Sequence, residues 1–273
     1  MRTVRCCVFV LLMLGMLLLC QSCSEVAITG RQQLNLVPDG IVAQMAGQQY
    51  QEFLTQNKLS NNASDTAMLQ RVGLRLSDAV VRYCKREGIY DRIQDYQWQF
   101  SLIDSKEKNA FAMPGGKVVV YTGLLPVTGD ETGLAVVMGH EIAHVIARHG
   151  NERMSQGLLV EFGGMALSKA MQSRPAATQD LFMRSYGYGA QLGFLLPYSR
   201  IHESEADRMG LIFMAMAGYD PRSAPDFWER MSQSHEGQGQ PPEILSTHPA
   251  DATRIANIKQ HLPEAMYYYT PGG

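Results

Sequence analysis

Two histidines and a glutamate stand close together in an apolar stretch, residues 137–150 (VMGHEIAHVIARHG). On a helix, residues four apart project side by side, so His140 and His144 share one face. Two imidazoles on one face can each give a nitrogen to Zn²⁺, which leaves positions for a third ligand and a water. Glu141 is turned about 100° away from His140. We therefore expect Glu141 to take a proton from a metal-bound water rather than to bind the metal.

The neighbours of this motif argue against a chance occurrence. Eight apolar residues predict that the helix is buried: Ala135, Val136, Val137, Met138, Ile142, Ala143, Val145 and Ile146. Unliganded buried histidines at this spacing would be costly. His149 lies about half a turn from His140, so we expect it to face away, as a polar residue of the last helical turn before Gly150.

The residues after His144 exclude one subclass of zinc peptidase. A metzincin needs Gly at position 147 and His at position 150, whereas this chain has Ala147 and Gly150. The alternative is a glutamate from a later segment, as in thermolysin. The third ligand must then come from further along the chain.

A later segment, SRIHESEADRMG, offers His202, Glu203 and Glu205 for this role. Glu203 and Asp207 are four apart, so a helix puts both carboxylates on one face. One of them can bind the metal while the other orients a ligand. Glu205 falls on the opposite side, where we expect it to be solvated or paired with Arg208. Spacing alone favours Glu203 over Glu205 without excluding the latter.

Hydrophobic periodicity predicts the elements that must position these residues. Helical spacing marks residues 38–57 and 65–87, and alternation over 96–103 predicts a half-buried strand. The stretch NAFAMPGGKVVVYTG predicts a strand, a Pro-Gly-Gly turn and a second strand. The remainder reads as helical over 130–149, 151–172, 178–196, 200–217, 223–234 and 249–261, with a polar loop at 235–243.

These elements predict the α+β class, mostly helical, with a small β-sheet before the HExxH helix. We expect one metallopeptidase domain over residues 23–273. It would consist of N-terminal helices (38–87), a small sheet (96–121) and active-site helices (130–261).

The first 22 residues have the pattern of a bacterial lipoprotein signal peptide. Arg2 and Arg5 form a positive start, and residues 8–19 form an apolar core shorter than a membrane-spanning helix needs. Cys23 follows a small serine, as a lipidation site requires, whereas Cys20 follows a leucine and is the alternative. We expect a lipid on Cys23 and an outer-membrane location facing the periplasm.

The charge balance argues against nucleic acid as a partner. The formal net charge is −2, and no run of five or more basic residues occurs. The expected partners are instead protein substrates and, through the lipid, a membrane.

Four motifs resemble one family in order: NAFAMPGGKVVVYTGLL, HEIAHVIARHG, ESEAD and STHPADATRI. The family is the gluzincin peptidase family that contains HtpX, the CAAX prenyl proteases and the periplasmic protease BepA. A fifth stretch, TGRQQLNLV, resembles the beginning of the lipoprotein and periplasmic members. The resemblance implies a zinc endopeptidase that acts on unfolded or misassembled envelope proteins, with the outer-membrane assembly machinery as a possible partner.

Carried over residue by residue, the resemblance implies a complete site with one Zn²⁺ per chain. The expected metal ligands are His140, His144 and Glu203. The expected catalytic residues are Glu141 as the base, Asp207 as a support or proton donor, and His248 at the entrance. The expected substrate-binding residues are Arg254 and an edge strand that an extended peptide can join, Asn109, Ala110, Phe111 and Ala112.

Two other readings compete with this one. The chain can be a chaperone-like binder that cleaves rarely, with His248 as a fourth metal ligand. It can also be an integral membrane protease, as some members of the family are. Glu161 and Lys169 interrupt residues 157–172, and glycines interrupt residues 186–200, so neither segment suits a bilayer.

Overall fold

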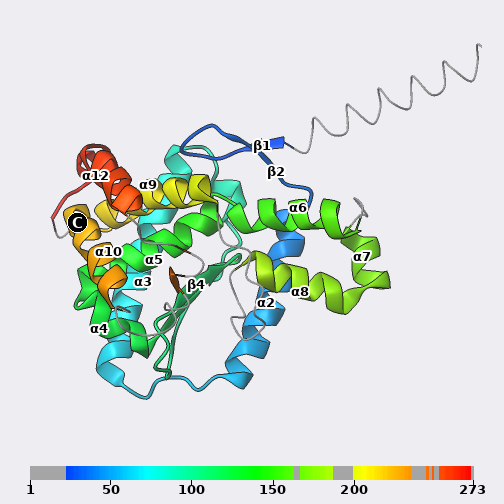
Figure 1. Cartoon of the computed structure of the whole chain (residues 1–273), viewed down its shortest axis with the longest axis horizontal. Coiled ribbons are helices and arrows are strands. Elements are labelled where there is room, and N and C mark those ends of the chain that lie inside the picture. Colours follow the sequence, from blue (N-terminus) through cyan, green and yellow to red (C-terminus); the bar gives the residue numbers. More distant parts are fainter. Residues whose placement is uncertain are drawn as a thin grey trace, which may run out of the picture.

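In the computed structural model, helices surround one small sheet (Figure 1), which confirms the predicted α+β class. The structure describes residues 23–162, 167–186, 199–234, 244–245, 248 and 252–271. The proposed signal peptide and the polar loop at 235–243 lie outside the described residues.

Two long helices lead into the sheet. After a short hairpin of β1 (Cys23–Glu25) and β2 (Gln32–Leu34), the chain forms α2 (Asp39–Gln56) and α3 (Ala63–Arg86). The Asn62 side chain accepts from the backbone N–H groups of Ser64 and Asp65, and this caps α3. Both helices match the predicted ranges within two residues, because the periodicity of the apolar residues indicates where each helix lies.

The three-stranded sheet has the order β3-β5-β4. Strand β3 (Gln99–Ile103) pairs with β5 (Lys117–Tyr121) in parallel, and β4 (Ala110–Met113) pairs with β5 antiparallel. Gly115 and Gly116 have φ of 82° and 81°, so the predicted tight turn between β4 and β5 needs glycine there. Among the described residues β4 is an edge strand, and it packs against α5 (Glu131–Ile146).

Helix α5 runs through the centre of the molecule, between the sheet and α9 (Arg200–Met216), as Figure 1 shows. Helix α12 (Ala252–Tyr267) lies on the other side of α9, and α10 (Ala224–Gln233) contacts α5 and α12. The shorter elements complete the described chain: α4 (Leu125–Thr128), α6 (His149–Phe162), α7 (Leu167–Ser173), α8 (Pro175–Ser185), and the 3-10 turns Tyr90–Arg92, Thr122–Leu124 and Pro221–Ser223. None of the helices in the described ranges is both long and apolar enough to cross a membrane.

The helix predicted over 130–149 is interrupted. Helix α5 ends at Ile146, and α6 begins at His149 in a new direction. Arg148, between them, has a φ of 62°, which is uncommon for a residue other than glycine. Its guanidinium lies 2.6 Å from the Asp39 carboxylate, so an ion pair from α2 holds this turn. This change of direction decides where His149 points.

Candidate metal centre and its supporting residues

A pair of glycines lets α5 and α9 approach each other closely. A Cβ at Gly210 would lie 2.9 Å from the backbone nitrogen of His140, and one at Gly139 would lie 3.1 Å from the carbonyl oxygen of Gly210. Larger residues at this crossing would push the two helices apart. Because Gly139 and Gly210 have no Cβ, α5 and α9 can pack closely enough for the candidate metal-site residues of the two helices to meet.

Four buried side chains meet where α5 and α9 cross. His140, His144, Glu203 and His248 each offer one donor atom, and the four atoms lie within 4.8 Å of one another. Nε2 of His140 lies 3.1 Å from Nε2 of His144 and 3.2 Å from Nδ1 of His248. Ligands about 2.0–2.1 Å from a tetrahedral Zn²⁺ lie about 3.3–3.4 Å apart. The donor set and its spacing thus fit zinc.

The carboxylate of Glu203 is held ionised beside these imidazoles. Burial by itself would raise its pKa, but the charges of His248 and Arg254 hold that pKa well below its ordinary value. One Glu203 oxygen lies 2.8 Å from His248 Nδ1 and 3.3 Å from His144 Nε2. An ionised carboxylate between nitrogen donors is a suitable metal ligand.

Glu141 lies beside the four-donor cluster without being one of its members. The side chain is buried, and its Oε1 atom has no hydrogen-bond partner among the described residues. Its distance from Nε2 of His248 is 3.6 Å. Burial raises the pKa of Glu141 to about 7, against an opposing effect of His248. A carboxylate with such a pKa can both accept and release a proton near neutral pH.

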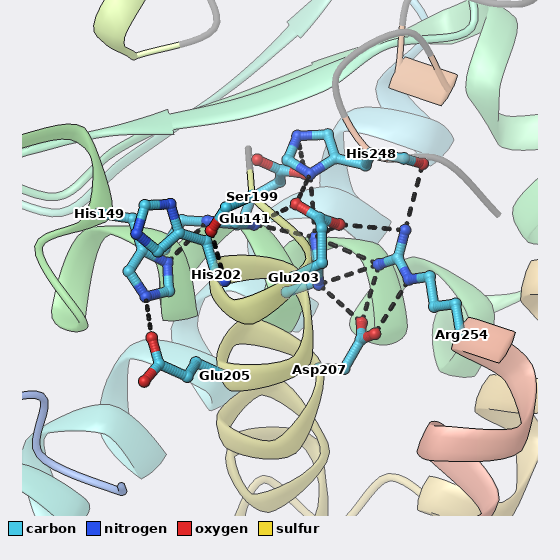
Figure 2. A network of polar contacts seen from close by, with 11 residues as sticks. Glu141, His149, Ser199, His202, Glu203, Glu205, Asp207, His248 and Arg254 are labelled. Atoms are coloured by element: carbon cyan, nitrogen blue, oxygen red, sulfur yellow. Dashed lines mark hydrogen bonds and ion pairs between the residues drawn. The ribbon is translucent and has the colours of Figure 1, made fainter. Parts of the chain in front are cut away.

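Asp207 and Arg254 lie side by side next to Glu203 (Figure 2), and both also contact His140. An Asp207 oxygen is 2.9 Å from Nδ1 of His140, so His140 donates there and its Nε2 faces the other ligands. The Arg254 guanidinium donates two hydrogen bonds to Asp207 and lies 3.2 Å from Glu203 Oε2. It also lies 3.4 Å from the ring centroid of Trp228, a buried residue of α10 whose role the sequence analysis missed. This arrangement orients His140 and Glu203, whereas a contact between Arg254 and a substrate stays a prediction.

The prediction that His149 faces away was wrong. Because α6 begins in a new direction, the His149 side chain is fully buried and its Nδ1 lies 2.9 Å from Nδ1 of His144. The prediction for Glu205 was also wrong. That carboxylate is buried and lies 2.9 Å from Nε2 of His149, while Arg208 pairs with Glu264. Burial lowers the pKa of His149 to about 4, so its ring is neutral.

A second group of charges, formed by the partly exposed Arg31 and two buried glutamates, adjoins His149. Arg31, which lies just before β2, forms ion pairs with Glu205 at 3.0 Å and with Glu152 of α6 at 2.8 Å. Glu152 also accepts a hydrogen bond from His202 at 3.0 Å. The sequence analysis missed this group, because the residues are far apart in the chain and no motif links them.

The expected substrate strand falls on β4 and the residue before it. The Asn109 side chain is buried and accepts from the backbone N–H of Ala110. Ala110, Phe111 and Ala112 are also buried, and the strand packs against the helix that carries the two histidines. At the N-terminus, the backbone of Cys23 pairs with Leu34 in the β1–β2 hairpin.

In this site a helix with two histidines meets a glutamate from a later helix, which is the donor arrangement of zinc peptidases such as thermolysin. Comparison with known families agrees. The profile of Peptidase family M48 matches residues 64–262, and the chain belongs to this family.

Several characterised proteins are similar to the chain. It is 37% identical to the mitochondrial metalloendopeptidase OMA1 of Schizosaccharomyces pombe over 190 residues, which cover 68% of this chain and 53% of that protein. It is 35% identical to human OMA1 over 64% of this chain and 34% of that protein. The beta-barrel assembly-enhancing protease of Escherichia coli is 32% identical over 59% of this chain and 34% of that protein. The chain thus matches about half or less of the length of these relatives.

Proposed function

We propose that the protein is a zinc-dependent endopeptidase that cleaves unfolded or misassembled proteins of the cell envelope. The observation that carries the proposal is the cluster of four buried donor atoms, all within 4.8 Å, in a chain of Peptidase family M48. Burying three imidazoles and a carboxylate so close together costs free energy of folding when nothing binds them. A bound cation offsets that cost.

His140, His144 and Glu203 would hold the metal in this proposal. Zinc in such a site polarises a substrate carbonyl and lowers the pKa of a bound water to about 7. The Asp207 carboxylate lies 2.9 Å from Nδ1 of His140 and would keep the proton of the ring on that atom. The lone pair on Nε2 would then be available to the metal. Glu141, whose Oε1 has no hydrogen-bond partner among the described residues, would take a proton from the attacking water and pass it to the leaving amine.

The substrate would bind as an extended segment beside β4. In the described part of the chain, β4 is hydrogen-bonded to β5 along one edge only. A peptide added to the other edge would be held by backbone hydrogen bonds, which select an extended shape more than a sequence. Such a mode suits substrates that are unfolded.

The envelope location is also part of the proposal. It is supported by the signal-like residues 1–22 and by the similarity to a bacterial protease named for β-barrel assembly. In cells that carry a bacterial envelope, intact-mass analysis of the membrane fraction should find a chain that begins at an acylated Cys23. A chain that begins at Met1, or a lipid on Cys20, would contradict the anchor.

The test of activity compares the wild type with Glu141→Gln. We expect about one zinc per chain in both proteins, and cleavage of a disordered model protein such as casein by the wild type alone. Zinc content measured by atomic emission shows whether the site is intact in the variant. Equal cleavage by the two proteins would exclude Glu141 as the base.

A second candidate function is a chaperone-like binder with latent proteolysis. One observation favours it: His248 lies within the cluster, 2.8 Å from Glu203 Oε1, where it can act as a fourth ligand. A fourth protein ligand would occupy the position that a catalytic water needs. In that case the wild type would hold zinc and bind casein without cleaving it.

A further inference from the structure

The two candidate histidine ligands differ in what stands behind them. Behind His140 is the carboxylate of Asp207, in direct contact with Nδ1. Behind His144 is another histidine, since Nδ1 of His144 lies 2.9 Å from Nδ1 of His149. The nearest carboxylate behind His144 contacts that second histidine, since Oε2 of Glu205 lies 2.9 Å from Nε2 of His149. His144 is therefore connected to a carboxylate through a second imidazole.

The direction of these hydrogen bonds follows from the chemistry of the groups. The Glu205 carboxylate can only accept, so the proton of the neutral His149 ring is on Nε2. Nδ1 of His149 then has a lone pair and accepts from Nδ1–H of His144. A neutral His144 with its proton on Nδ1 has its lone pair on Nε2, the atom that lies 3.1 Å from His140 Nε2. One carboxylate thus sets the tautomers of two successive rings.

Glu205 is in turn held by the N-terminal hairpin. The Thr29 hydroxyl donates to Glu205 Oε1 at 2.6 Å, and Arg31 donates to both Glu205 oxygens at 3.0 Å. Arg31 also donates to both oxygens of Glu152, at 2.9 and 2.8 Å. Two buried carboxylates would repel each other without this cation. The hairpin is itself attached to α6, where the backbone N–H of Leu36 donates to the hydroxyl of Ser155.

Glu152 supports the His149 ring indirectly, through the ring of His202 that stacks on it. Glu152 accepts from Nε2 of His202 at 3.0 Å, and the His202 ring stacks on the His149 ring with centroids 4.4 Å apart and planes inclined by 20°. His149 is thereby fixed by a hydrogen bond at each ring nitrogen and by a ring on its face. Its side chain has no exposed surface, so water does not compete for these contacts.

We infer that Glu205 is a positioning residue, which through His149 fixes the Nδ1–H tautomer of His144 and presents Nε2 to the metal, and that Thr29 and Arg31 couple the N-terminal hairpin to this site. The inference rests on the proposed role of His144 as a zinc ligand. It makes the affinity for zinc depend on a segment more than 100 residues away from the HExxH motif in the chain.

The first test measures the dissociation constant for zinc by competition with a chromophoric chelator in the full chain. We expect Glu205→Gln to bind zinc about ten- to a hundredfold more weakly, the range found when such supporting partners are removed. Arg31→Gln should weaken binding in the same direction. The matched control is Glu264→Gln, which removes a carboxylate of α12 that pairs with Arg208 of α9, and its zinc affinity should equal that of the wild type. An unchanged affinity in both Glu205→Gln and Arg31→Gln would overturn the inference.

The second test separates tautomer control from general loss of structure. Long-range ¹H–¹⁵N spectra of the metal-free wild type should show His144 with its proton on Nδ1. In Glu205→Gln, whose amide can donate as well as accept, a population with the proton on Nε2 should appear. An Nε2–H tautomer of His144 in the metal-free wild type would overturn the inference without any variant. A wild type that shows the Nδ1–H tautomer but binds no zinc would instead contradict the proposed function.

Discussion

At the scale of single residues, the candidate site separates donors from the groups that orient them. Nε2 of His140 and Nε2 of His144 face the cluster, while each Nδ1 faces a supporting group. Glu203 lies against the imidazoles of both His144 and His248. We therefore expect the same substitution to have a larger effect on zinc binding at a donor than at a group that orients a donor.

Replacing the carboxylate donor should remove the metal. We expect Glu203→Gln to lose most of the zinc at micromolar concentrations, because a neutral amide replaces the one anionic donor of the cluster. Glu205→Gln, a matched change two residues away, should still reach one zinc per chain at saturation. Atomic emission after dialysis measures both. Zinc retained in full by Glu203→Gln would contradict its assignment as a ligand.

The role of His248 can be read from the direction of a rate change. As an oxyanion donor it would contribute a few kcal/mol, so we expect His248→Ala to lower turnover of casein by about a hundredfold or more with zinc content maintained. If His248 instead holds the enzyme latent as a fourth ligand, the same variant would cleave faster than the wild type. A rate and a zinc content both equal to those of the wild type would leave His248 only a structural role.

At the scale of elements, the site depends on how closely α5 and α9 pack. Gly139 and Gly210 lie opposite each other at the crossing, one residue before His140 and three residues after Asp207. The close contact between the helices therefore lies next to His140 and within one helical turn of Asp207. The break at Arg148 is the second decisive feature, because it turns His149 back toward His144.

A methyl group at the crossing should loosen the site. In Gly210→Ala the new Cβ would lie 2.9 Å from the His140 backbone nitrogen, and backbone cannot move aside as a side chain can. We expect a loss of about 1–3 kcal/mol in the free energy of unfolding, together with weaker zinc binding. The control is Gly47→Ala in α2, where a Cβ would meet nothing within 4 Å, and it should be neutral or stabilising. Urea unfolding of the metal-free proteins measures the difference, and equal stability of the two variants would contradict close packing at the crossing.

At the scale of the whole molecule, buried charges tie the N-terminal hairpin to the helical part of the domain. Burial by itself would raise the pKa values of Glu152 and Glu205. Hydrogen bonds from His202 and Arg31 to Glu152, and from His149 and Arg31 to Glu205, lower both values to about 2. In the unfolded chain both return to about 4.3. Their contribution to stability is therefore complete above this value and is lost as the pH falls from there toward 2.

Removing the shared cation should move this loss to higher pH. We expect Arg31→Gln to raise the pKa values of Glu152 and Glu205, so that the variant begins to lose stability at a higher pH than the wild type. The measurement is urea unfolding of the metal-free protein at a series of pH values from 7 to 3. The control is Lys58→Gln, which removes the cation of an exposed pair with Asp104 and should leave the pH dependence unchanged. Identical pH profiles for the wild type and Arg31→Gln would show that the pairs do not lower these pKa values.

The features that depend on neighbours along the chain could be predicted from the amino-acid sequence. Apolar periodicity located α2 and α3, and the Pro-Gly-Gly turn located β4 and β5, because these signals act over a few residues. The four-residue spacing of His140 and His144 was sufficient to predict a shared face and a metal site. Resemblance to a family supplied the order of the later motifs, including Glu203 and His248.

The contacts between groups far apart in the sequence could not be predicted and followed from the packing of the elements. His149 was predicted to face away on the assumption of a continuous helix, and the turn at Arg148, held by Asp39 of α2, reversed its direction. Glu205 was predicted to be solvated or paired with Arg208, but it pairs instead with the hairpin residue Arg31, 174 positions earlier. The contacts of a buried charge depend on how helices and strands pack. A local sequence pattern does not show which distant helix or strand will lie against the charge. The donors and the supporting Asp207 could thus be predicted from the chain, whereas the contacts of His149, Glu205 and Arg31 followed from the fold.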